Sequence, residues 1–401
     1  MGDPRNINRR QKYLNQKKKY KKLLYLTKKS VAEKDMRRIG ELATKSPNLF
    51  WKNIKHLMKN TQSQTNNYIS PKGWVAYFKK LLNNPKPSNL EQIHSGKSGP
   101  LDFNFTADEI VEQIKRLKTN KSASTSIINE MLKCSPDTIA KSLVEIFNFV
   151  LKERVYPKIW NISHISPLFK AGAPTDANNY RGICVGNAIG KLFNKCINKR
   201  IEDFLRNRKT IPDNSMGFRR KIQTEHAMHT LHTVNSKYKK LNKKLTIFID
   251  FSKVYDTITH DLLFLKLERI VIFGNVLGIL KSMYKGLQYN VKLHYYGKYG
   301  LTEPFTANIG LKQGCPLSPT LANIFLHDIH KGLRMKDISL GKIFFNSIAW
   351  ADDLVFFALS REGINKQLAH LERYCREWRL RVNIDKTKCI IFSPNLFVYG
   401  V

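Results

Sequence analysis

The sequence predicts an α+β fold in which many helices surround a small antiparallel sheet. Two observations support this class. Amphipathic stretches of helical length recur along most of the chain, and a few short β-rich runs interrupt them at irregular intervals. With 401 residues, the chain can bury a sizeable core, so we expect one large folded unit with appended segments.

The N-terminal region is strongly basic. Residues 1–60 contain 18 Lys and Arg but only 4 Asp and Glu, and the lysine runs 17–19 and 21–22 alternate with Tyr and Leu. This pattern fits either a solvated basic helix or a clamp on nucleic-acid phosphates, and the basic charge of the whole chain favours the clamp. Residues 84–100 are rich in Pro, Gly and Ser and indicate a linker. Residues 1–83 are therefore predicted to be a basic helical extension.

After this linker, sequence periodicity predicts most of the helices and strands. The segment 106–109 (TADE) has the pattern of a capping box and opens a helix whose apolar face carries Ile110, Ile114 and Leu117. A second helix carries Leu143 and Phe147 and ends near Pro157. Further helices are expected at about 188–208, 223–242, 257–270, 274–287, 318–334 and 361–379. Strands are expected at about 245–250, 290–296, 342–349, 354–358 and 389–392.

Composition restricts the classes of partner. Lys and Arg number 69 against 31 Asp and Glu, a net charge of +38, which indicates a polyanionic partner and most simply nucleic acid. No run approaches the roughly 20 apolar residues of a membrane-spanning helix, and the charged N-terminus lacks the apolar segment of a secretory signal. The six cysteines form no CxxC pair, so we expect reduced thiols inside a cell.

Three carboxylates stand at the ends of predicted strands. Asp352 and Asp353 are adjacent and lie between two apolar runs, and Asp250 ends the run 245–249. Neighbouring like charges are unfavourable unless a cation neutralises them. If a tight turn places the pair at a hairpin tip beside Asp250, the three can bind two metal ions about 3.5–4 Å apart. The pattern therefore suggests a divalent-cation site suited to phosphoryl transfer. Solvated loop residues are the alternative for an adjacent acidic pair, and the neighbouring segments decide between the two.

The segments around these carboxylates carry a family resemblance. They are 248–263 (FIDFSKVYDTITHDLL), 310–321 (GLKQGCPLSPTL) and 378–388 (WRLRVNIDKTK), and in this order they resemble the palm motifs of reverse transcriptases, most closely those of non-LTR (LINE-type) retrotransposons. Upstream, Trp160 and the segments 167–170 (PLFK), 179–183 (NYRGI), 190–192 (GKL) and 217–219 (GFR) resemble the fingers of that family. The segments 50–52 and 74–78 resemble its N-terminal extension, so the resemblance covers about residues 45–393.

The resemblance implies a right-hand polymerase and its chemistry. Residues 101–243 would form the fingers and the N-terminal part of the domain, 244–393 the palm, and 394–401 a truncated tail with the thumb largely missing. The implied activity is RNA-directed DNA polymerase, which adds deoxynucleoside triphosphates to a DNA primer on an RNA template. Asp250, Asp352 and Asp353 would hold two Mg²⁺ ions, with Mn²⁺ as an alternative. The implied location is the nucleus, with no membrane partner; the oligomeric state stays open.

Further roles are carried over by the same resemblance. Tyr255 falls where the family has an aromatic gate that excludes a 2′-hydroxyl, although a core aromatic is the alternative. Phe251 is assigned to nucleotide binding beside it. Lys386 falls where related polymerases place a lysine that protonates the departing pyrophosphate, and a solvated lysine is the alternative.

The remaining assignments concern the incoming nucleotide. Gln313 and Gly314 match a loop that touches template and nucleotide, where the missing side chain of Gly314 would let backbone approach the substrate. A plain turn before a helix with Pro316 near its first position is the alternative. Lys170 and Arg181 match basic residues of the fingers that grip the triphosphate.

Two departures from the family pattern support a second hypothesis. Trp350 replaces the usual Tyr or Phe before the Ala-Asp-Asp sequence, and 121–126 (KSASTS) lacks the turn-forming Pro-Gly and the acidic residue of the family. Together with the expected loss of the thumb, they favour a decayed element fragment that binds nucleic acid without polymerising. A third hypothesis is an RNA-templated RNA polymerase that uses the same carboxylates.

Overall fold

The chain divides into two compact units, Met1–Asn67 and Tyr68–Val401. The computed structural model describes residues 14–27, 68–83, 97–238, 244–295, 298–332, 338–340, 343–344, 346–393 and 396–400, together with single positions at 30, 33, 41 and 46. In the first unit, residues 14–27 form a helix whose side chains are all exposed. Most of the predicted linker, 84–96, lies outside the described residues.

The second unit begins before helix α3 (Pro71–Leu81), earlier than the boundary predicted at residue 83. Ser70 caps this helix by accepting a hydrogen bond from the backbone N–H of Gly73. Trp74 and Phe78 are buried, and the Trp74 ring meets that of Tyr180 edge to face at 4.9 Å. The basic composition of the N-terminal region concealed this anchor, because its two aromatic side chains pack into the main core.

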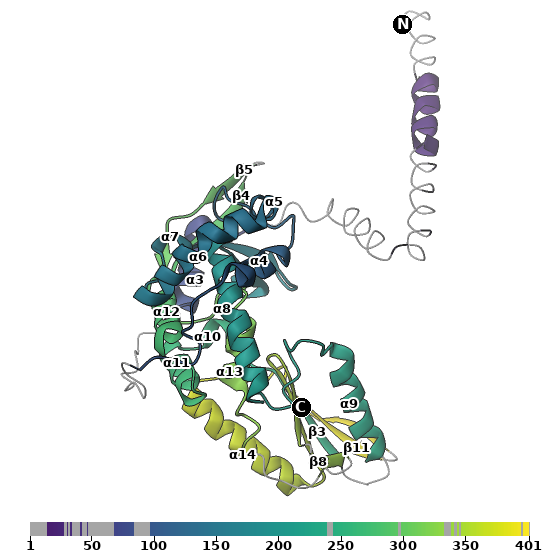
Figure 1. Ribbon diagram of the computed structural model, residues 1–401. Helices are drawn as coiled ribbons and strands as arrows, with labels where there is room; N and C mark the ends of the chain where they lie inside the picture. Colours follow the sequence, from purple (N-terminus) through teal and green to yellow (C-terminus); the bar gives the residue numbers. More distant parts are fainter. Residues whose placement is uncertain are drawn as a thin grey trace, which may run out of the picture. The chain divides into compact units, whose positions relative to one another are not determined.

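The second unit contains two separate five-stranded sheets together with its helices (Figure 1). The first consists of β1 (Ile162–Phe169), β2 (Tyr180–Val185), β4 (Gln288–Tyr295), β5 (Lys298–Leu301) and β6 (Phe305–Thr306), in the order β2-β1-β4-β5 with β6 paired to β4. The second consists of β12 (Leu396–Gly400), β11 (Lys388–Ser393), β3 (Lys244–Ile249), β10 (Asp353–Ala358) and β9 (Ser347–Trp350), in that order. β7 (Ser339–Leu340) and β8 (Ile343–Phe344) form a separate pair.

The second sheet is antiparallel throughout, which confirms the predicted α+β class with a small antiparallel sheet. In the first sheet, β4 corresponds to the strand predicted at 290–296, but β1, β2, β5 and β6 were not predicted, and β1 and β4 pair in parallel. Within the predicted truncated tail at 394–401, the backbone of β12 pairs with β11.

The predicted helices are present as α4 (Ala107–Lys115), α6 (Pro136–Glu153), α8 (Ala188–Asn207), α9 (Thr224–Lys237), α11 (His260–Arg269), α12 (Gly274–Lys285), α13 (Ser318–Leu326) and α14 (Arg361–Trp378). The short elements α5 (Asn129–Cys134), α7 (Lys158–Asn161), α10 (Val254–Thr257) and a 3₁₀ turn (Ala177–Asn179) were not predicted. α13 is shorter than the predicted 318–334, and Pro319 rather than Pro316 lies at its first turn.

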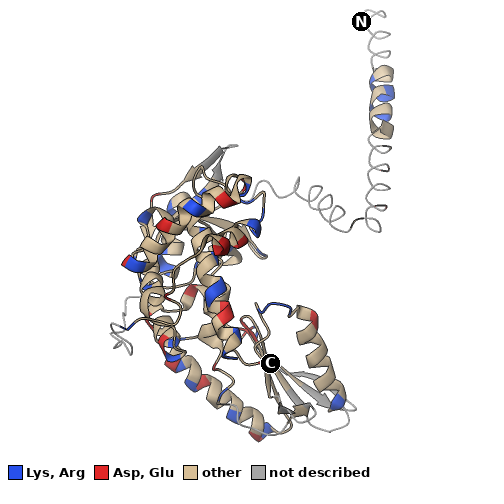
Figure 2. Ribbon diagram, viewed as in Figure 1, with Lys and Arg blue, Asp and Glu red and all other residues tan. Residues whose placement is uncertain are grey.

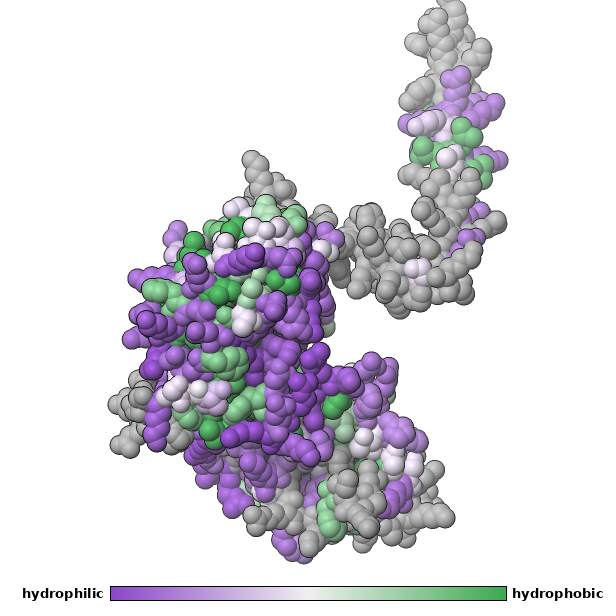
Figure 3. Space-filling model, viewed as in Figure 1, coloured by the Kyte–Doolittle hydropathy of each residue, from purple (hydrophilic) through white to green (hydrophobic). Residues whose placement is uncertain are grey.

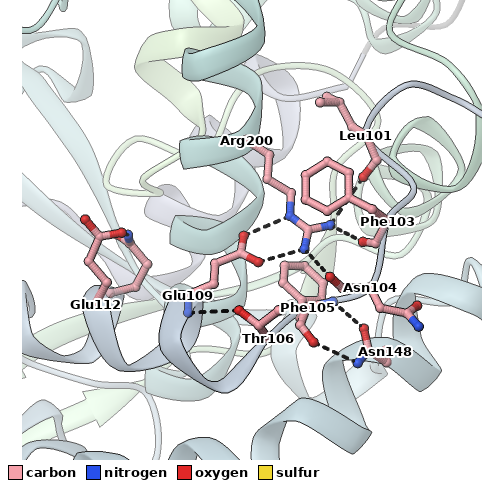
Figure 4. Close-up of polar contacts among 10 residues, drawn as sticks. Leu101, Phe103, Asn104, Phe105, Thr106, Glu109, Glu112, Asn148 and Arg200 are labelled. Carbon is pink, nitrogen blue, oxygen red and sulfur yellow. Dashed lines mark hydrogen bonds and ion pairs between the residues drawn. The ribbon is translucent and has the colours of Figure 1, made fainter.

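A buried arginine joins three segments of the first half of this unit (Figure 4). Arg200, on α8, donates to both carboxylate oxygens of Glu109, on α4, at 2.8 and 2.7 Å. It also donates to the carbonyl oxygens of Phe103 and Asn104 and lies between the rings of Phe103 and Phe105. The capping box predicted at 106–109 is therefore only half formed. Thr106 accepts from the Glu109 backbone, but the Glu109 carboxylate binds Arg200 instead.

The face of this unit that Figure 3 shows is largely hydrophilic, with hydrophobic side chains gathered over α6 and α7. Helix α6 is apolar on two faces: Phe147 and Leu151 lie in the core, whereas Ile146 and Phe149 are exposed. Within the described part of the chain, every helix is too short or too polar to cross a membrane.

Candidate active site

The central strands of the second sheet place two carboxylates opposite each other. Asp250 directly follows β3, and Leu354 of β10 pairs with Ile249 of β3. Continued by one step, this antiparallel register would set Asp353 opposite Asp250, and the charge of Asp250 contributes to raising the pKa of Asp353. Residues that are opposite each other on neighbouring strands project from the same face of a sheet. The fold therefore brings together two residues that are about a hundred positions apart in the sequence.

The third carboxylate lies in the turn between β9 and β10. Asp353 pairs with Trp350, which leaves Ala351 and Asp352 as a two-residue hairpin turn. This arrangement confirms the predicted tight turn. Ala351 has φ 58°, a left-handed conformation that costs a residue with a Cβ atom about 1–2 kcal/mol. Such a positive φ at the first turn residue is typical of hairpins whose twist matches their strands. Strain of this kind is found where a turn must hold functional groups in place.

The three carboxylates influence one another electrostatically. Partial burial, followed by the negative charges of Asp352 and then Asp250, raises the pKa of Asp353 above its usual range. Their oxygens are the ligands that Mg²⁺ prefers, so the donor chemistry fits a divalent cation. Among the described residues, however, no three His, Cys, Asp or Glu side chains converge into a preformed metal-binding cluster. The carboxylates are thus close neighbours at the end of the sheet, not a closed ligand set.

The segment 381–387 fixes the backbone at Asp250 and brings Lys386 beside the site. The backbone N–H of Asn383 donates to the carbonyl oxygen of Asp250 at 2.7 Å, and that of Ser252 donates to the carbonyl oxygen of Arg381 at 2.8 Å. Phe251 bridges to Val382 between these two bonds. Lys386 lies in the exposed turn that follows.

The basic residues predicted to grip a triphosphate lie near Lys386. Lys170 directly follows β1, and Arg181 lies on β2, to which β1 pairs. Partial burial and the positive charges of Arg181 and Lys386 lower the pKa of Lys170. Because such shifts need neighbouring charges, three cations predicted from separate segments form one basic cluster.

Asp256 belongs to this site, although the sequence analysis did not single it out. Burial raises the pKa of its carboxyl group, whereas a hydrogen bond from Gln313 and the charges of Lys253, Lys170 and Arg181 oppose the rise. The Gln313 side-chain amide donates to Asp256 at 2.7 Å. An acidic residue one helical turn beyond Lys253, within an otherwise apolar stretch, was the signal that could have identified it.

Tyr255 is influenced by a carboxylate and by the basic cluster, through the charges of Asp352 and Arg181. Its half-buried ring packs against the core and meets the Phe218 ring edge to face at 6.4 Å. Its buried hydroxyl has no hydrogen-bond partner in the structure. Burial and the charge of Asp352 raise the pKa of this hydroxyl, while Arg181 opposes the rise. The ring is thus both a core aromatic and a neighbour of Asp352.

The loop at Gln313 and Gly314 is tied to β2. The backbone N–H of Cys184 donates to the carbonyl oxygen of Gln313 at 2.6 Å. Gly314 has φ 116°, and a Cβ atom there would lie 2.6 Å from the carbonyl oxygen of Cys184. The close approach of β2 therefore already requires a glycine at this position, and the predicted contact with a substrate stays a prediction. The side chain of Phe251 is 4% exposed and lies in the core, and its predicted part in nucleotide binding likewise stays a prediction.

Residues 214–217 brace the carboxylate turn from the other side. Ser215 bridges to Ala349 of β9, and the backbone N–H of Met216 donates to the Ala349 carbonyl oxygen at 2.8 Å. A Cβ atom on Gly217 would lie 2.1 Å from the backbone nitrogen of Ala351. The segment 217–219, assigned to the fingers by resemblance, thus packs directly against the turn that carries Asp352.

Comparison with known families identifies the class of protein. The family profile described as "Reverse transcriptase (RNA-dependent DNA polymerase)" matches residues 170–397, more than half of the chain and all of the site described above. The chain belongs to the reverse transcriptase family.

The relatives it matches come from non-LTR retrotransposons. The chain is 28% identical over 347 residues to a probable RNA-directed DNA polymerase from transposon BS of Drosophila melanogaster, covering 82% of this chain and 37% of the relative. It is 25% identical over 299 residues to the polymerase of the mobile element jockey from the same organism, covering 72% and 32%. The chain therefore spans about a third of the length of these curated relatives.

Among solved structures, the chain is similar to apo telomerase from Candida tropicalis truncated from its C-terminal domain. The TM-score is 0.42 at 15% identity, covering 66% of this chain and 56% of the telomerase chain.

Proposed function

We propose that this chain is the polymerase core of a non-LTR retrotransposon, which adds deoxynucleotides to a primer 3′-hydroxyl on an RNA template. The observation that supports the proposal is the register of β3 and β10, whose last pair adjoins Asp250 and Asp353, with Asp352 in the adjoining hairpin turn. Lys170, Arg181 and Lys386 lie close enough together that Arg181 and Lys386 lower the pKa of Lys170. This basic cluster supplies positive charge that complements the carboxylates. Anionic and cationic groups in one site suit the transfer of a metal-bound phosphoryl group.

Asp250, Asp352 and Asp353 would hold Mg²⁺, or Mn²⁺ as an alternative. A bound divalent cation supplies Lewis-acid stabilisation of the charge that develops on the transferring phosphate. The protein keeps the carboxylates at the sheet end through the register of β3, β9 and β10, and it fixes Asp250 through Asn383.

The basic residues would bind and orient the triphosphate. Lys170 and Arg181 offer a point charge and a forked donor to its oxygens. Lys386, in its exposed turn, would donate a proton to the departing pyrophosphate. Gln313 is held by Asp256 and would present its backbone or amide to the nucleotide. The N-terminal basic helix, residues 14–27, would hold template phosphates, and the nucleus is the expected location.

We expect Tyr255→Ala to relax the choice between deoxynucleotides and ribonucleotides. Removal of the ring opens space beside Asp352, where a 2′-hydroxyl would otherwise clash. Ribonucleotide incorporation should rise about tenfold or more relative to deoxynucleotide incorporation, which corresponds to roughly 1.4 kcal/mol or more of lost discrimination. The measurement is the ratio of kcat/KM for UTP and dTTP. Tyr255→Phe serves as the control, because it keeps the ring and removes only a hydroxyl without a partner.

Two alternatives compete with this proposal. Trp350, which pairs with Asp353 beside the turn, and the altered loop 121–126 favour a fragment that binds nucleic acid without polymerising. An RNA-templated RNA polymerase would use the same carboxylates but would prefer ribonucleotides.

Primer extension by the wild-type chain distinguishes the three. With poly(rA)/oligo(dT), dTTP and Mg²⁺, we expect extension that stops when EDTA removes the metal and returns when Mg²⁺ is restored. Tight template binding without extension would favour the binding fragment. Faster extension with UTP than with dTTP would favour the RNA polymerase.

A further inference from the structure

A basic hollow lies beside the active site, because Lys253, which lines it, follows Asp250 by three residues. Its volume is about 750 Å³, and its walls come from α3, the 3₁₀ turn after β1, α10 and the C-terminal end of α14. Five basic side chains line it: Lys80, Lys253, Arg376, Arg379 and Arg381. Among the described residues that line it, none is Asp or Glu.

Acidic residues are absent from the described lining although they are present on the helix that forms one of its walls. Along α14, basic and acidic residues alternate, as Figure 2 shows. Arg376 pairs with Glu372 one turn earlier, at 2.9 Å, but Glu372 does not line the hollow. The helix therefore presents its positive charge, and not its negative charge, to this space.

Lys253 connects the hollow to the active site. Its ammonium donates to the hydroxyl of Tyr77 at 2.9 Å and to the side-chain oxygen of Asn178 at 2.8 Å. These bonds hold the lysine between α3 and the 3₁₀ turn, on the wall of the hollow. The same charge opposes protonation of Lys170 and of Asp256, both of which belong to the site. The positive charge of Lys253 therefore contributes both to the hollow and to the active site.

The chemistry of the lining selects a small polyanion. Lysine and arginine together supply point charges and forked donors, which match the closely spaced oxygens of linked phosphates. The cations come from α3, from the residue before α10, and from the end of α14 with the residues that follow it, so they lie on several walls of the hollow instead of forming a flat stripe along one helix. A stripe would suit the backbone of a nucleic acid, whereas a hollow of this size suits pyrophosphate or the triphosphate of a nucleotide.

We propose that this hollow is a second polyphosphate site, separate from the one formed by Lys170 and Arg181. Through Lys253, it would receive pyrophosphate leaving the active site or the triphosphate of an arriving nucleotide. The use assigned to it rests on the proposed polymerase function, but its affinity for polyphosphate does not.

Calorimetric titration of the full chain with tripolyphosphate in EDTA tests the affinity directly. We expect two ligands per wild-type chain, and one in Lys80→Gln/Arg376→Gln, whose remaining site binds as in the wild type. Loss of two exposed cations should weaken the second site about tenfold or more. Lys141→Gln/Lys152→Gln, on α6, removes the same charge elsewhere and should keep both sites. A single site in the wild type, or equal weakening by both double variants, would overturn the proposal.

Extension kinetics identify the source of the polyphosphate. If added pyrophosphate inhibits Lys80→Gln/Arg376→Gln more weakly than the wild type, at unchanged KM for dTTP, then the hollow receives departing pyrophosphate. A raised KM at unchanged kcat indicates the arriving nucleotide. A wild-type chain that binds two tripolyphosphates but extends no primer would refute the polymerase and leave the site standing. A wild-type chain that extends primers but binds only one tripolyphosphate would refute the second polyphosphate site and leave the polymerase function standing.

Discussion

Asp352→Asn should reduce primer extension by at least about a thousandfold, which corresponds to roughly 4 kcal/mol of lost transition-state stabilisation. The change keeps the shape of the side chain but removes the charge from the turn between β9 and β10, where a divalent cation would bind. An amide is a poorer ligand for Mg²⁺ than a carboxylate and cannot neutralise the ion. The measurement is kcat/KM for dTTP on poly(rA)/oligo(dT) with Mg²⁺.

The same substitution should leave the fold intact. Asp352 is one cause of the raised pKa of Asp353, so repulsion between the two carboxylates opposes folding above that pKa. At neutral pH, the variant should therefore unfold at the same temperature as the wild type or at a higher one. Asp137→Asn, an exposed residue in the first turn of α6, makes the same chemical change elsewhere and should retain full activity. Extension by Asp352→Asn within tenfold of wild type would contradict the assignment of this carboxylate.

The sequence allowed the helices of this fold to be predicted because their signals are local. The stripe of Ile364, Leu371 and Trp378 faces the core in α14, whose observed ends differ by only one residue from the predicted 361–379. Strands β3, β10 and β11 could also be predicted, because β-rich runs and adjacent acidic residues marked their ends. Asp250, Asp352 and Asp353 were identified in the same way.

Features that depend on contacts between distant segments could not be predicted. Strand β1 pairs in parallel with β4, and that register joins Ile162 to Gln288, which no periodicity within either segment reveals. The glycine at position 314 is required by the close approach of the Cys184 carbonyl oxygen of another strand, a contact that the local sequence does not reveal. Asp256 is tied into the site by a hydrogen bond that it accepts from Gln313, 57 residues further along the chain.

The basic N-terminal region illustrates a different limit. Charge alone predicted one extension to residue 83, whereas Trp74 and Phe78 make α3 part of the main core. Lysines on the same helix remain exposed, and Lys80 lines the basic hollow. A segment can therefore be basic in composition and still anchor the fold through two buried rings, because charged side chains occupy only its outer face.

Gly217→Ala should disrupt the active site without contact with any substrate. The new methyl group would lie 2.1 Å from the backbone nitrogen of Ala351 and 2.9 Å from its Cα atom, so backbone must move. Ala351 is already in the left-handed region, and the turn has little freedom to absorb a shift. A displacement of about 1 Å at a reacting group can cost about a hundredfold in rate, and we expect kcat/KM to fall by about that factor.

The loss of stability should be smaller than the loss of activity. Overpacking of this kind typically costs about 1–3 kcal/mol, which urea unfolding can measure. Gly300→Ala is the matched control, because a Cβ atom there meets nothing within 4 Å, and it should preserve both activity and stability. A Gly217→Ala variant that extends primers within threefold of wild type would mean that the 214–217 segment can move away from the turn. Bracing by this segment would then not determine where Asp352 lies.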